Sequence, residues 1–322
     1  MNSPAASSVS AAAARIDRSG PGCPLCGGQQ AKPSWLGSTV YDGRTYSYLR
    51  CVGCRSLYCD PMPRREALAR LYGSEYQVVL ADHEDGGERE IGRVIQSLQA
   101  GRRIPGTFVD YGCGRGRLMQ EVSRLGWRVI GVEFDDAVAA SVAREIGLSV
   151  VGRDEAHRSL RGRADVLHLG DVVEHLTAID EEMPAILELI APDGVLIAQG
   201  PLESNANLFT LVLRVTRTMT QSRTSTMPPY HVLLATADGQ RRLFTRLGLV
   251  ARDFEISEVA WPAPRRLGLR DIGNIRKVGF WVLRLVSQII SHIGPRDWGN
   301  RYFYVGERTR LSPQLEGSLS AT

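Results

Sequence analysis

Short apolar runs alternate with longer stretches of helical apolar spacing from residue 107 onward. This alternation is typical of a mostly parallel sheet with helices on both of its faces. We therefore expect an α/β, Rossmann-like fold built on a seven-stranded, mostly parallel sheet. The predicted strands span residues 107–110, 128–134, 149–152, 165–170, 194–200, 250–258 and 302–308, and the predicted helices span about 116–126, 136–147, 177–191 and 236–248.

The remaining chain divides by composition. The first 22 residues are rich in Ala and Ser and have little to bury, so we expect a disordered tail. Pro61 and Pro63 close a cysteine-containing module, after which we expect a helix from Arg64 to about Tyr76 and a polar linker over residues 82–90. The expected organisation is a tail at 1–22, the cysteine module at 23–60, a helical connector at 61–104, a large domain at 105–310 with an insertion at 260–300, and a tail at 311–322.

The composition is that of an ordinary globular protein, with 43% hydrophobic and 23% charged residues. The formal net charge of +4 is small for 322 residues, and basic side chains are interspersed with acidic ones, so no strong signal for nucleic-acid binding is present. No segment reaches the roughly 20 apolar residues of a membrane-spanning helix, and the N-terminus lacks a secretion-signal pattern. Since four of the six cysteines form two C-x-x-C pairs, we expect a reducing compartment and a cytoplasmic location.

A glycine-rich turn follows the first strand of the predicted sheet. The segment from Phe108 to Gly116 is an apolar strand with Asp110 near its end, continued by a G-x-G-x-G turn before a helix. Glycines allow a sharp turn and close approach of a ligand, and the helix N-terminus offers N–H groups to a carboxylate. Glu133 ends the next apolar strand, where it can accept hydrogen bonds from both hydroxyls of a ribose. A nicotinamide dinucleotide site fits less well, because Arg117 occupies the sixth position of G-x-G-x-x-G.

These motifs resemble class I S-adenosylmethionine-dependent methyltransferases over residues 107–255. Asp110 is typical of that family's first motif, and the segment from Asp165 to Leu176 resembles its D-V-x-x-x-x-D-V-x-E-H-L block. The resemblance implies S-adenosylmethionine as the cofactor, with Asp154 facing the adenine; Arg153 stands where the family often has an acid. The implied cofactor-binding residues are Asp110, Gly112, Cys113, Gly114, Gly116, Glu133, Phe134, Asp154 and Asp171.

Three features near these motifs have structural as well as functional interpretations. Glu174 and His175 are expected to begin a helix, which they can cap without touching a substrate. Pro228-Pro229-Tyr230 is similar to a base-binding motif of nucleic-acid methyltransferases, but it follows the fifth strand instead of the fourth, so we expect a turn. His231 lies in the crossover expected above the carboxyl edge of the sheet, where similar enzymes carry a histidine. It is the predicted catalytic base, and a hydrogen bond that only holds the loop is the alternative.

Two cysteine pairs, Cys23/Cys26 and Cys51/Cys54, have the spacing C-x2-C-x24-C-x2-C. Two tight turns of this kind offer four thiolates to one tetrahedral zinc ion, and residues 34–36 and 45–49 between them indicate short strands of a ribbon. A site with four cysteine ligands has no open coordination position, so the Zn²⁺ should be structural. The segment from Cys23 to Tyr76 resembles the zinc-ribbon leader of many bacterial small-molecule methyltransferases.

The sequence thus predicts methyl transfer from S-adenosylmethionine to a small-molecule, glycan or lipid-linked acceptor, most simply at an oxygen atom. An RNA methyltransferase that holds nucleic acid with its ribbon, and a non-catalytic cofactor-binding protein, are the alternatives. The ribbon has few basic residues, which speaks against RNA: Lys32, Arg44, Arg50 and Arg55. Residues 275–293 show helical apolar spacing in a stretch too short and polar to span a membrane. This helix can cover the acceptor pocket, contact a partner or a membrane surface, or pack as an ordinary helix.

Overall fold

The computed structural model describes residues 16–17, 22–64, 67, 87–101, 104–208, 210–212, 214–215, 224–225, 229–258, 273–293 and 297–309. Most of the connector helix predicted from Arg64 to about Tyr76 lies outside these residues, as do Pro228 and nearly all of the two predicted tails.

The large sheet has the seven strands that the apolar runs predict, in the order β12-β13-β9-β8-β5-β6-β7. Neighbouring strands from β9 to β7 are parallel, whereas β13 is antiparallel to both β9 and β12. The strand order changes direction between β5 and β8, where ligands of open α/β sheets usually bind. The bounds are β5 Thr107–Tyr111, β6 Arg128–Glu133, β7 Ser149–Gly152, β8 Ala164–Gly170, β9 Ile190–Pro201, β12 Leu249–Ser257 and β13 Arg301–Arg308.

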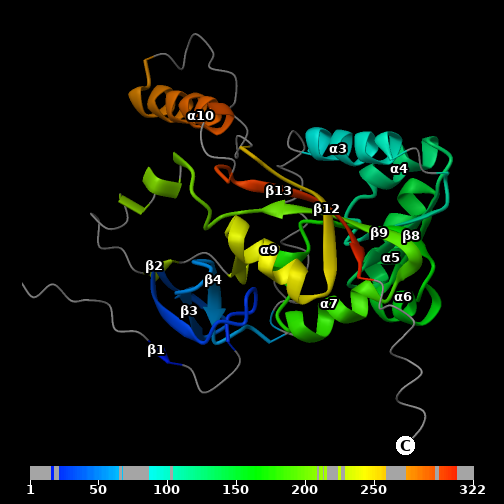
Figure 1. Ribbon diagram of the computed structural model, residues 1–322, viewed down its shortest axis with the longest axis horizontal. Helices are drawn as coiled ribbons and strands as arrows, with labels where there is room; N and C mark the ends of the chain where they lie inside the picture. Colours follow the sequence, from blue (N-terminus) through cyan, green and yellow to red (C-terminus); the bar gives the residue numbers. More distant parts are fainter. Residues whose placement is uncertain are drawn as a thin grey trace, which may run out of the picture.

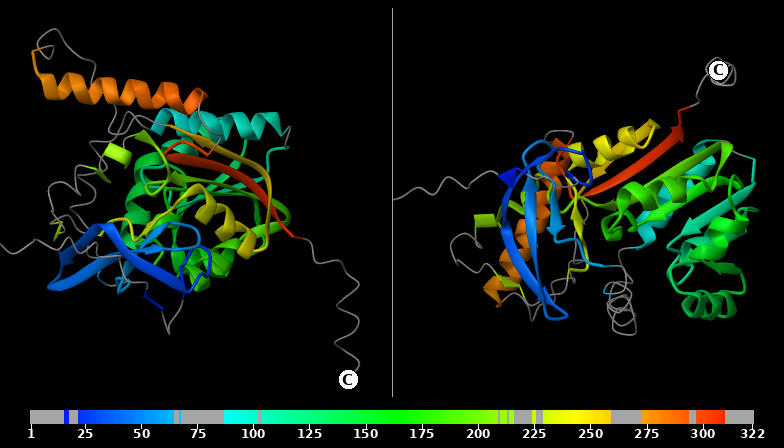
Figure 2. Two further views of the ribbon diagram at one scale, coloured as in Figure 1. Left: turned by 60° about the vertical axis from the view of Figure 1, so that its left-hand side comes forward. Right: turned by 90° about the horizontal axis from the view of Figure 1, so that it is seen from below.

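Helices cover both faces of this sheet, as predicted (Figures 1 and 2). Alternate residues of a strand point to opposite faces, so Phe108 packs in one core with α3, α4 and α5, and Val109 packs in another with α6, α7 and α9. The bounds are α3 Gly87–Ala100, α4 Arg117–Arg124, α5 Asp136–Ile146, α6 Arg153–Ser159, α7 Ile179–Leu187 and α9 Ala237–Arg246.

Two helices differ from the sequence-based expectation. The first turn of α3 lies in the stretch that we expected to be a linker, and its short apolar side buries only Val94 and Leu98. The sequence of α6 is mostly polar and buries only Ala156, so the apolar periodicity gave no signal there.

The cysteine module forms a second sheet with the order β1-β2-β3-β4-β11, with β10 beside β2. The predicted strands are present but longer, and Asp42-Gly43, both with positive φ, make the turn between β2 and β3. Residues 16–17, expected in the disordered tail, pair with β2. The bounds are β1 Ile16–Asp17, β2 Gln30–Tyr41, β3 Arg44–Cys51, β4 Leu57–Asp60, β10 Thr224–Ser225 and β11 Leu233–Leu234.

This ribbon is joined tightly to the large domain. Strand β11 comes from the crossover after β9 and pairs with β4, so one hydrophobic core spans both parts. Thr236 caps α9: its Oγ1 accepts a hydrogen bond from Gly239 N (3.0 Å) and donates one to Cys54 O (2.6 Å). A Cβ on Gly239 would come within 2.2 Å of Ser56 Oγ, so the close approach of α9 to the ribbon requires glycine.

The apolar pattern at 275–293 forms the helix α10 (Ile275–Ile293), at the outer edge of the molecule in Figures 1 and 2. Among the helices in the described part of the chain, none combines the length and apolar character that crossing a bilayer requires.

Candidate active site

The glycine turn lies directly after β5, at the point where the strand order changes direction. Gly112 N and Cys113 N donate hydrogen bonds to Val132 O at 2.8 and 3.2 Å, which fixes the turn beside β6. Gly112 has a φ of 77°, and a Cβ there would lie 2.7 Å from Val172 Cγ2. The turn therefore packs against the segment that follows β8. A Cβ on Gly114 would meet no atom within 4 Å, so this position of the turn faces open space.

Glu133 at the end of β6 faces the glycine turn. Its Oε1 accepts a hydrogen bond from Gly114 N (2.5 Å), and its Oε2 accepts one from Phe134 N (3.3 Å). Burial raises the pKa of Glu133, although both N–H donors act in the opposite direction. An open glycine turn next to a half-buried carboxylate at the adjacent strand end fits the methionine and ribose parts of S-adenosylmethionine.

Asp110 and Cys113, both predicted to bind the cofactor, direct their side chains into the protein. His168 Nδ1 on β8 lies 2.7 Å from Asp110 Oδ1, and Gln199 Nε2 on β9 lies 3.3 Å from His168 Nε2. The Cys113 thiol is 8% exposed and faces Gly131, so only its backbone can reach a ligand in the turn. His168 and Gln199 were not among the predicted site residues; their signal in the sequence is a polar residue inside an otherwise apolar strand.

Phe134, Arg153 and Asp154 gather at the carboxyl ends of β6 and β7. The Arg153 guanidinium lies 5.0 Å from the ring centroid of Phe134 and donates hydrogen bonds from Nε and Nη2 to Asp154 Oδ1 at 3.1 Å. Asp154 lies in the first turn of α6 with a side chain 74% exposed. This arrangement brings an aromatic face and a carboxylate together where the adenine is expected, and Arg153 joins them.

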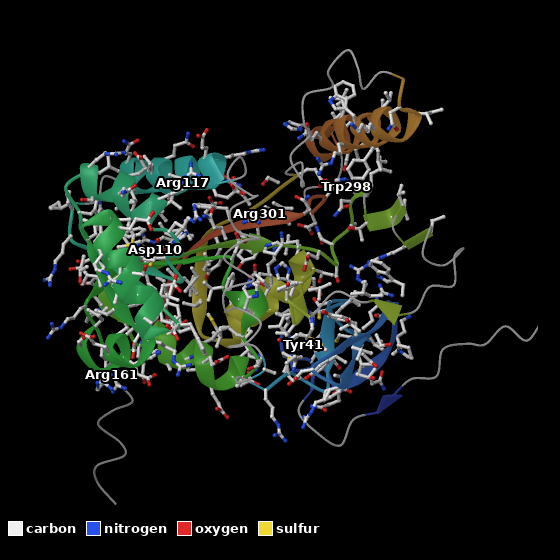
Figure 3. All side chains as sticks on the ribbon, turned by 180° about the vertical axis from the view of Figure 1, so that it is seen from behind. Tyr41, Asp110, Arg117, Arg161, Trp298 and Arg301 are labelled. Atoms are coloured by element: carbon white, nitrogen blue, oxygen red, sulfur yellow. The ribbon has the colours of Figure 1, made fainter. Side chains whose placement is uncertain are left out.

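Asp171, at the end of β8, has a φ of 52° and accepts a hydrogen bond from Arg301 Nη2 at 2.7 Å. Arg301 on β13 also contacts Glu90 of α3, with Nε 3.3 Å from Oε1. In Figure 3, Asp110 and Arg301 lie toward the middle of the molecule, whereas Arg161 is at its periphery. Asp171 thus stands at the end of β8, one residue before Val172, which packs against the glycine turn, and it forms an ion pair that the sequence did not predict.

His231 is in contact with two side chains that follow other strands. Its Nδ1 lies 2.8 Å from Oε2 of Glu203, which follows β9, and its ring is 4.8 Å from that of His175 in an edge-to-face arrangement. The His175 Nδ1 donates to Tyr230 O (2.9 Å), and Val232 N donates to Glu174 O (2.9 Å). The crossover therefore passes over the carboxyl edge of the sheet, next to the residues that follow β8.

Glu174 and His175 lie in a 3₁₀ turn (Val173–His175) instead of beginning an α-helix as expected. Ligand atoms of Glu174, His175 and His231 lie within 4.8 Å of one another. His175 holds the loop through its hydrogen bond to Tyr230 O. The side chains of Glu174 and His175 also lie beside His231. Glu174 is 5% exposed, and its Oε1 has no hydrogen-bond partner among the described residues.

The ionisation of this cluster differs from that of its members in water. Burial, followed by the charge of Asp171, raises the pKa of Glu174 to about 8. Burial and the charge of His231 lower the pKa of His175 to about 4. Burial alone would lower the pKa of His231, but the charge and hydrogen bond of Glu203 outweigh it and raise that pKa to about 9. The charge and hydrogen bond of Glu203 therefore favour the protonated imidazole of His231.

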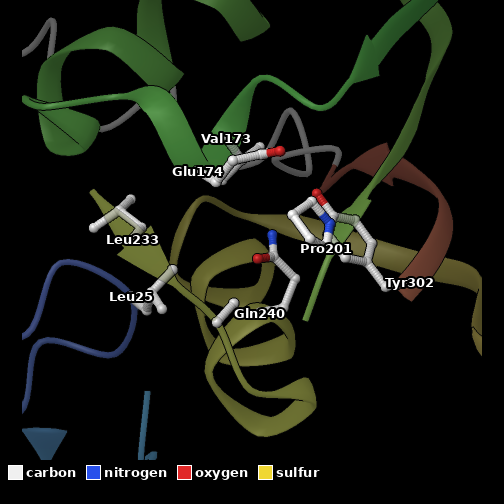
Figure 4. Close-up of a pocket in the computed structure, with 8 residues that line it drawn as sticks. Leu25, Val173, Glu174, Pro201, Leu233, Gln240 and Tyr302 are labelled. Atoms are coloured by element: carbon white, nitrogen blue, oxygen red, sulfur yellow. The ribbon is translucent and has the colours of Figure 1, made fainter. Parts of the chain in front are cut away.

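A small pocket opens beside Glu174 at the junction of the two sheets (Figure 4). Among the described residues, three buried polar atoms here have no hydrogen-bond partner: Glu174 Oε1, Gln240 Nε2 and Tyr302 Oη. Buried polar atoms are normally paired, so these three atoms are exceptions among the described residues. Other pocket residues come from the ribbon, from the turn after β8 and from the chain around β9 and β11: Leu25, Val173, Pro201, Leu233 and Ala235.

The four predicted zinc ligands come together at the tips of the ribbon. Cys23 Sγ lies 3.7 Å from Cys54 Sγ, and Cys26 Sγ lies 3.5 Å from Cys51 Sγ. These separations are too long for disulfides. They match the edge of about 3.8 Å that a tetrahedron with Zn–S bonds of about 2.3 Å requires. The cluster therefore fits one structural zinc ion, and Cys59 and Cys113 remain separate buried thiols.

A sequence profile described as "Methyltransferase domain" matches residues 81–253, which is more than half of the chain. The ubiquinone biosynthesis O-methyltransferase of Agrobacterium fabrum is 32% identical over 107 residues, covering 31% of this chain and 43% of that protein. The ribosomal protein L11 methyltransferase of Pelotomaculum thermopropionicum is 34% identical over 126 residues, covering 37% of this chain and 40% of that protein. This chain thus spans less than half of the length of either relative.

Among solved structures, a SAM dependent methyltransferase from Archaeoglobus fulgidus aligns with a TM-score of 0.47 at 17% identity. The alignment covers 72% of this chain and 99% of that chain.

Proposed function

This chain belongs to the methyltransferase-domain family, and from that premise we propose that it transfers a methyl group from S-adenosylmethionine to an oxygen of a small-molecule acceptor. The observation that carries the proposal is the open glycine turn beside Glu133, at the place in the sheet where the strand order reverses. The names of the relatives include both a small-molecule O-methyltransferase and a protein methyltransferase. The name of the first relative, a ubiquinone biosynthesis O-methyltransferase, supports the small acceptor.

We assign the cofactor to the residues around the glycine turn. The backbone of Gly112, Cys113, Gly114 and Gly116 would hold the methionine part, Glu133 the ribose, and Phe134 with Asp154 the adenine. Asp110 would act through His168, because its carboxylate is turned inward. When bound, S-adenosylmethionine supplies a methyl group on a positively charged sulfur that is already reactive, so the protein's main task is to place the acceptor in line.

We assign the acceptor to the edge formed by Asp171, Glu174, His175 and His231. The bound cofactor would supply the methyl group to the acceptor oxygen, and its sulfur would keep the electron pair of the carbon–sulfur bond. The hydroxyl proton must leave the acceptor oxygen. His231 is the proposed base, since Glu203 bonds to Nδ1 and leaves Nε2 as the proton acceptor. Because the pKa of His231 is raised, the active neutral form should become more abundant as pH rises.

The acceptor itself is proposed as a class: a small molecule, free or linked to a glycan or lipid. We also propose a cytoplasmic enzyme, which the six cysteines without disulfides support. No observation favours RNA, because the ribbon residues nearest the site, such as Tyr48, hold the His231 loop. A non-catalytic protein would have no need of the His231–Glu203 pair.

The test is transfer of an isotopically labelled methyl group from S-adenosylmethionine to extracts of a strain that lacks this gene. We expect label in a low-molecular-weight or lipid-linked fraction, and mass spectrometry should find the same species lighter by one methylene in the deletion strain. Label confined to RNA or ribosomal protein would replace the proposed acceptor class. Absence of cofactor binding in calorimetry would remove the proposal altogether.

A further inference from the structure

Arg301 is the first residue of β13, and the sheet places it at the edge where the cofactor is expected. Strand β13 runs antiparallel to β9, and its register pairs Arg301 with Pro201, the last residue of β9. An antiparallel strand begins where its neighbour ends. Arg301 therefore lies at the carboxyl edge of the parallel strands, and Figure 3 shows it toward the middle of the molecule.

The Arg301 guanidinium joins two carboxylates from separate elements. Its Nη2 donates a hydrogen bond to Asp171 Oδ1 (2.7 Å), and its Nε lies 3.3 Å from Oε1 of Glu90, in the first turn of α3. The Arg301 and Glu90 side chains are each 17% exposed, so their ion pair is largely shielded from water. A planar guanidinium that contacts two carboxylates through different nitrogens holds both of them in a fixed direction.

Asp171 is the more accessible carboxylate of this group. Its side chain is 52% exposed, so it has a side open to a ligand while Arg301 holds the other. Burial would lower the pKa of Arg301, but the charges of Asp171, Glu90 and Glu174 outweigh it and raise that pKa. Arg301 is therefore charged, and its charge offsets that of Asp171.

Asp171 lies between the two parts of the proposed site. The next residue, Val172, packs against Gly112 of the glycine turn, and Glu174 lies beside His231. A methyl group that passes from the cofactor to the acceptor therefore passes beside Asp171. The sulfonium of S-adenosylmethionine carries a positive charge, whereas the product S-adenosylhomocysteine is neutral. A carboxylate at this position attracts the charged cofactor more than the product.

We propose that Arg301 is a positioning residue that orients Asp171 and offsets its negative charge, and so sets how strongly the site prefers S-adenosylmethionine over S-adenosylhomocysteine. This role rests on the proposed function, because it requires the cofactor to bind at the glycine turn. Without Arg301, the Asp171 carboxylate would stabilise the positive sulfonium before transfer. The charge on sulfur declines during transfer, and only interactions that strengthen in the transition state accelerate a reaction. The ion pair thus limits a ground-state attraction that would slow the enzyme.

Calorimetric titration of the full chain with S-adenosylmethionine and, separately, with S-adenosylhomocysteine tests this role, and the ratio of the two dissociation constants is the readout. In Arg301→Gln, the ratio should shift roughly fivefold or more toward S-adenosylmethionine, because the charge of Asp171 is no longer offset. Arg301→Lys keeps the charge and should stay within about twofold of the wild-type ratio. The double variant Asp171→Asn/Arg301→Gln removes both charges and should return to within about twofold of wild type.

A second variant does not depend on folding without Arg301. Asp171→Asn changes a half-exposed side chain, and Asn tolerates the φ of 52° at this position. It leaves the Arg301 charge less balanced, so the ratio should shift in the opposite direction, toward S-adenosylhomocysteine. A ratio that stays at the wild-type value in Asp171→Asn would overturn the proposal.

The matched control is Arg93→Gln. Arg93 also joins α3 to the sheet, but its partners Ser257 (Nη1 to Oγ, 3.2 Å) and Glu255 belong to β12. Looser packing of α3 should weaken both ligands equally, so Arg93→Gln should keep the wild-type ratio. An equal loss for both ligands in Arg301→Gln would reduce Arg301 to a structural role and overturn the proposal. Wild-type protein that binds neither ligand would overturn the proposed function as well.

Discussion

Removing the zinc should release His231 while leaving the cofactor site folded. The ribbon holds the crossover through several contacts: Tyr48 Oη donates to His231 O (2.9 Å), Cys59 N donates to Val232 O (2.9 Å), and Thr236 bonds to both Cys54 O and Ser56 Oγ. Strand β11 also pairs with β4. The glycine turn and Glu133 have their own contacts within the large sheet.

The free energy that holds the His231 loop in place can be estimated from those hydrogen bonds. Each contributes about 0.5–1.5 kcal/mol, so four of them give roughly 2–6 kcal/mol in favour of the ordered loop. A general base contributes about 10²–10⁴-fold to a rate, which is about 3–5 kcal/mol. The two ranges overlap, so a ribbon that unfolds without zinc is sufficient to remove most of the contribution of His231.

Hydrogen exchange measures the release of the His231 loop without a known acceptor. In zinc-loaded protein, the amides of residues 231–236 should exchange slowly. After chelation they should exchange at least tenfold faster, while residues 107–133 stay protected and calorimetry shows cofactor affinity within a few-fold of the starting value. Tyr48→Phe, which keeps the ring and the zinc, should give a smaller effect on the same loop. Unchanged protection of 231–236 in metal-free protein, or parallel loss at 107–133, would refute this reasoning.

Three further outcomes test the assigned site. Gly114→Val, at a position with φ of 53°, and Glu133→Ala should each weaken S-adenosylmethionine binding more than tenfold in calorimetry, and unchanged affinity in both would exclude this turn as the cofactor site. His231→Asn should keep that affinity but lower kcat by roughly 10²–10⁴-fold, and a wild-type kcat would return His231 to a structural role. The kcat/KM of wild type should rise with pH as His231 loses its proton, and Glu203→Gln, which removes the charge that raises this pKa, should move the rise to lower pH; an unmoved profile would assign the titration to another group, such as Glu174.

The large sheet could be predicted because its strands are buried and their apolar runs are local. Strand β5 has Phe108 and Val109 fully buried on opposite faces, which leaves a short apolar run that cannot be mistaken for an exposed strand. Helix α6 could not be found in this way, since only Ala156 of its seven residues is buried. Apolar periodicity arises from buried positions, so an element with almost no buried residues cannot be predicted from it.

The two halves of the site were unequally predictable for a similar reason. The cofactor half depends on residues close in sequence, namely a glycine turn and a carboxylate at the next strand end. The proposed acceptor half depends on Glu174, Glu203 and His231, which come from three separate segments. Spacing along the chain does not report this convergence. The pairing of β4 with β11, which brings the ribbon against His231, involves two-residue contacts that leave no pattern in the sequence.

Helix α10 shows a different limit of periodicity. The spacing of its apolar residues predicts the helix and its two sides, but it does not predict which side turns inward. The usual rule turns the apolar side inward because the alternative is water. In this protein, Glu258 is only 7% exposed at the end of β12 and requires a polar neighbour, and Ser287 provides one. The direction of α10 thus agrees with a contact to a buried carboxylate on another element, which hydrophobic spacing within the helix cannot report.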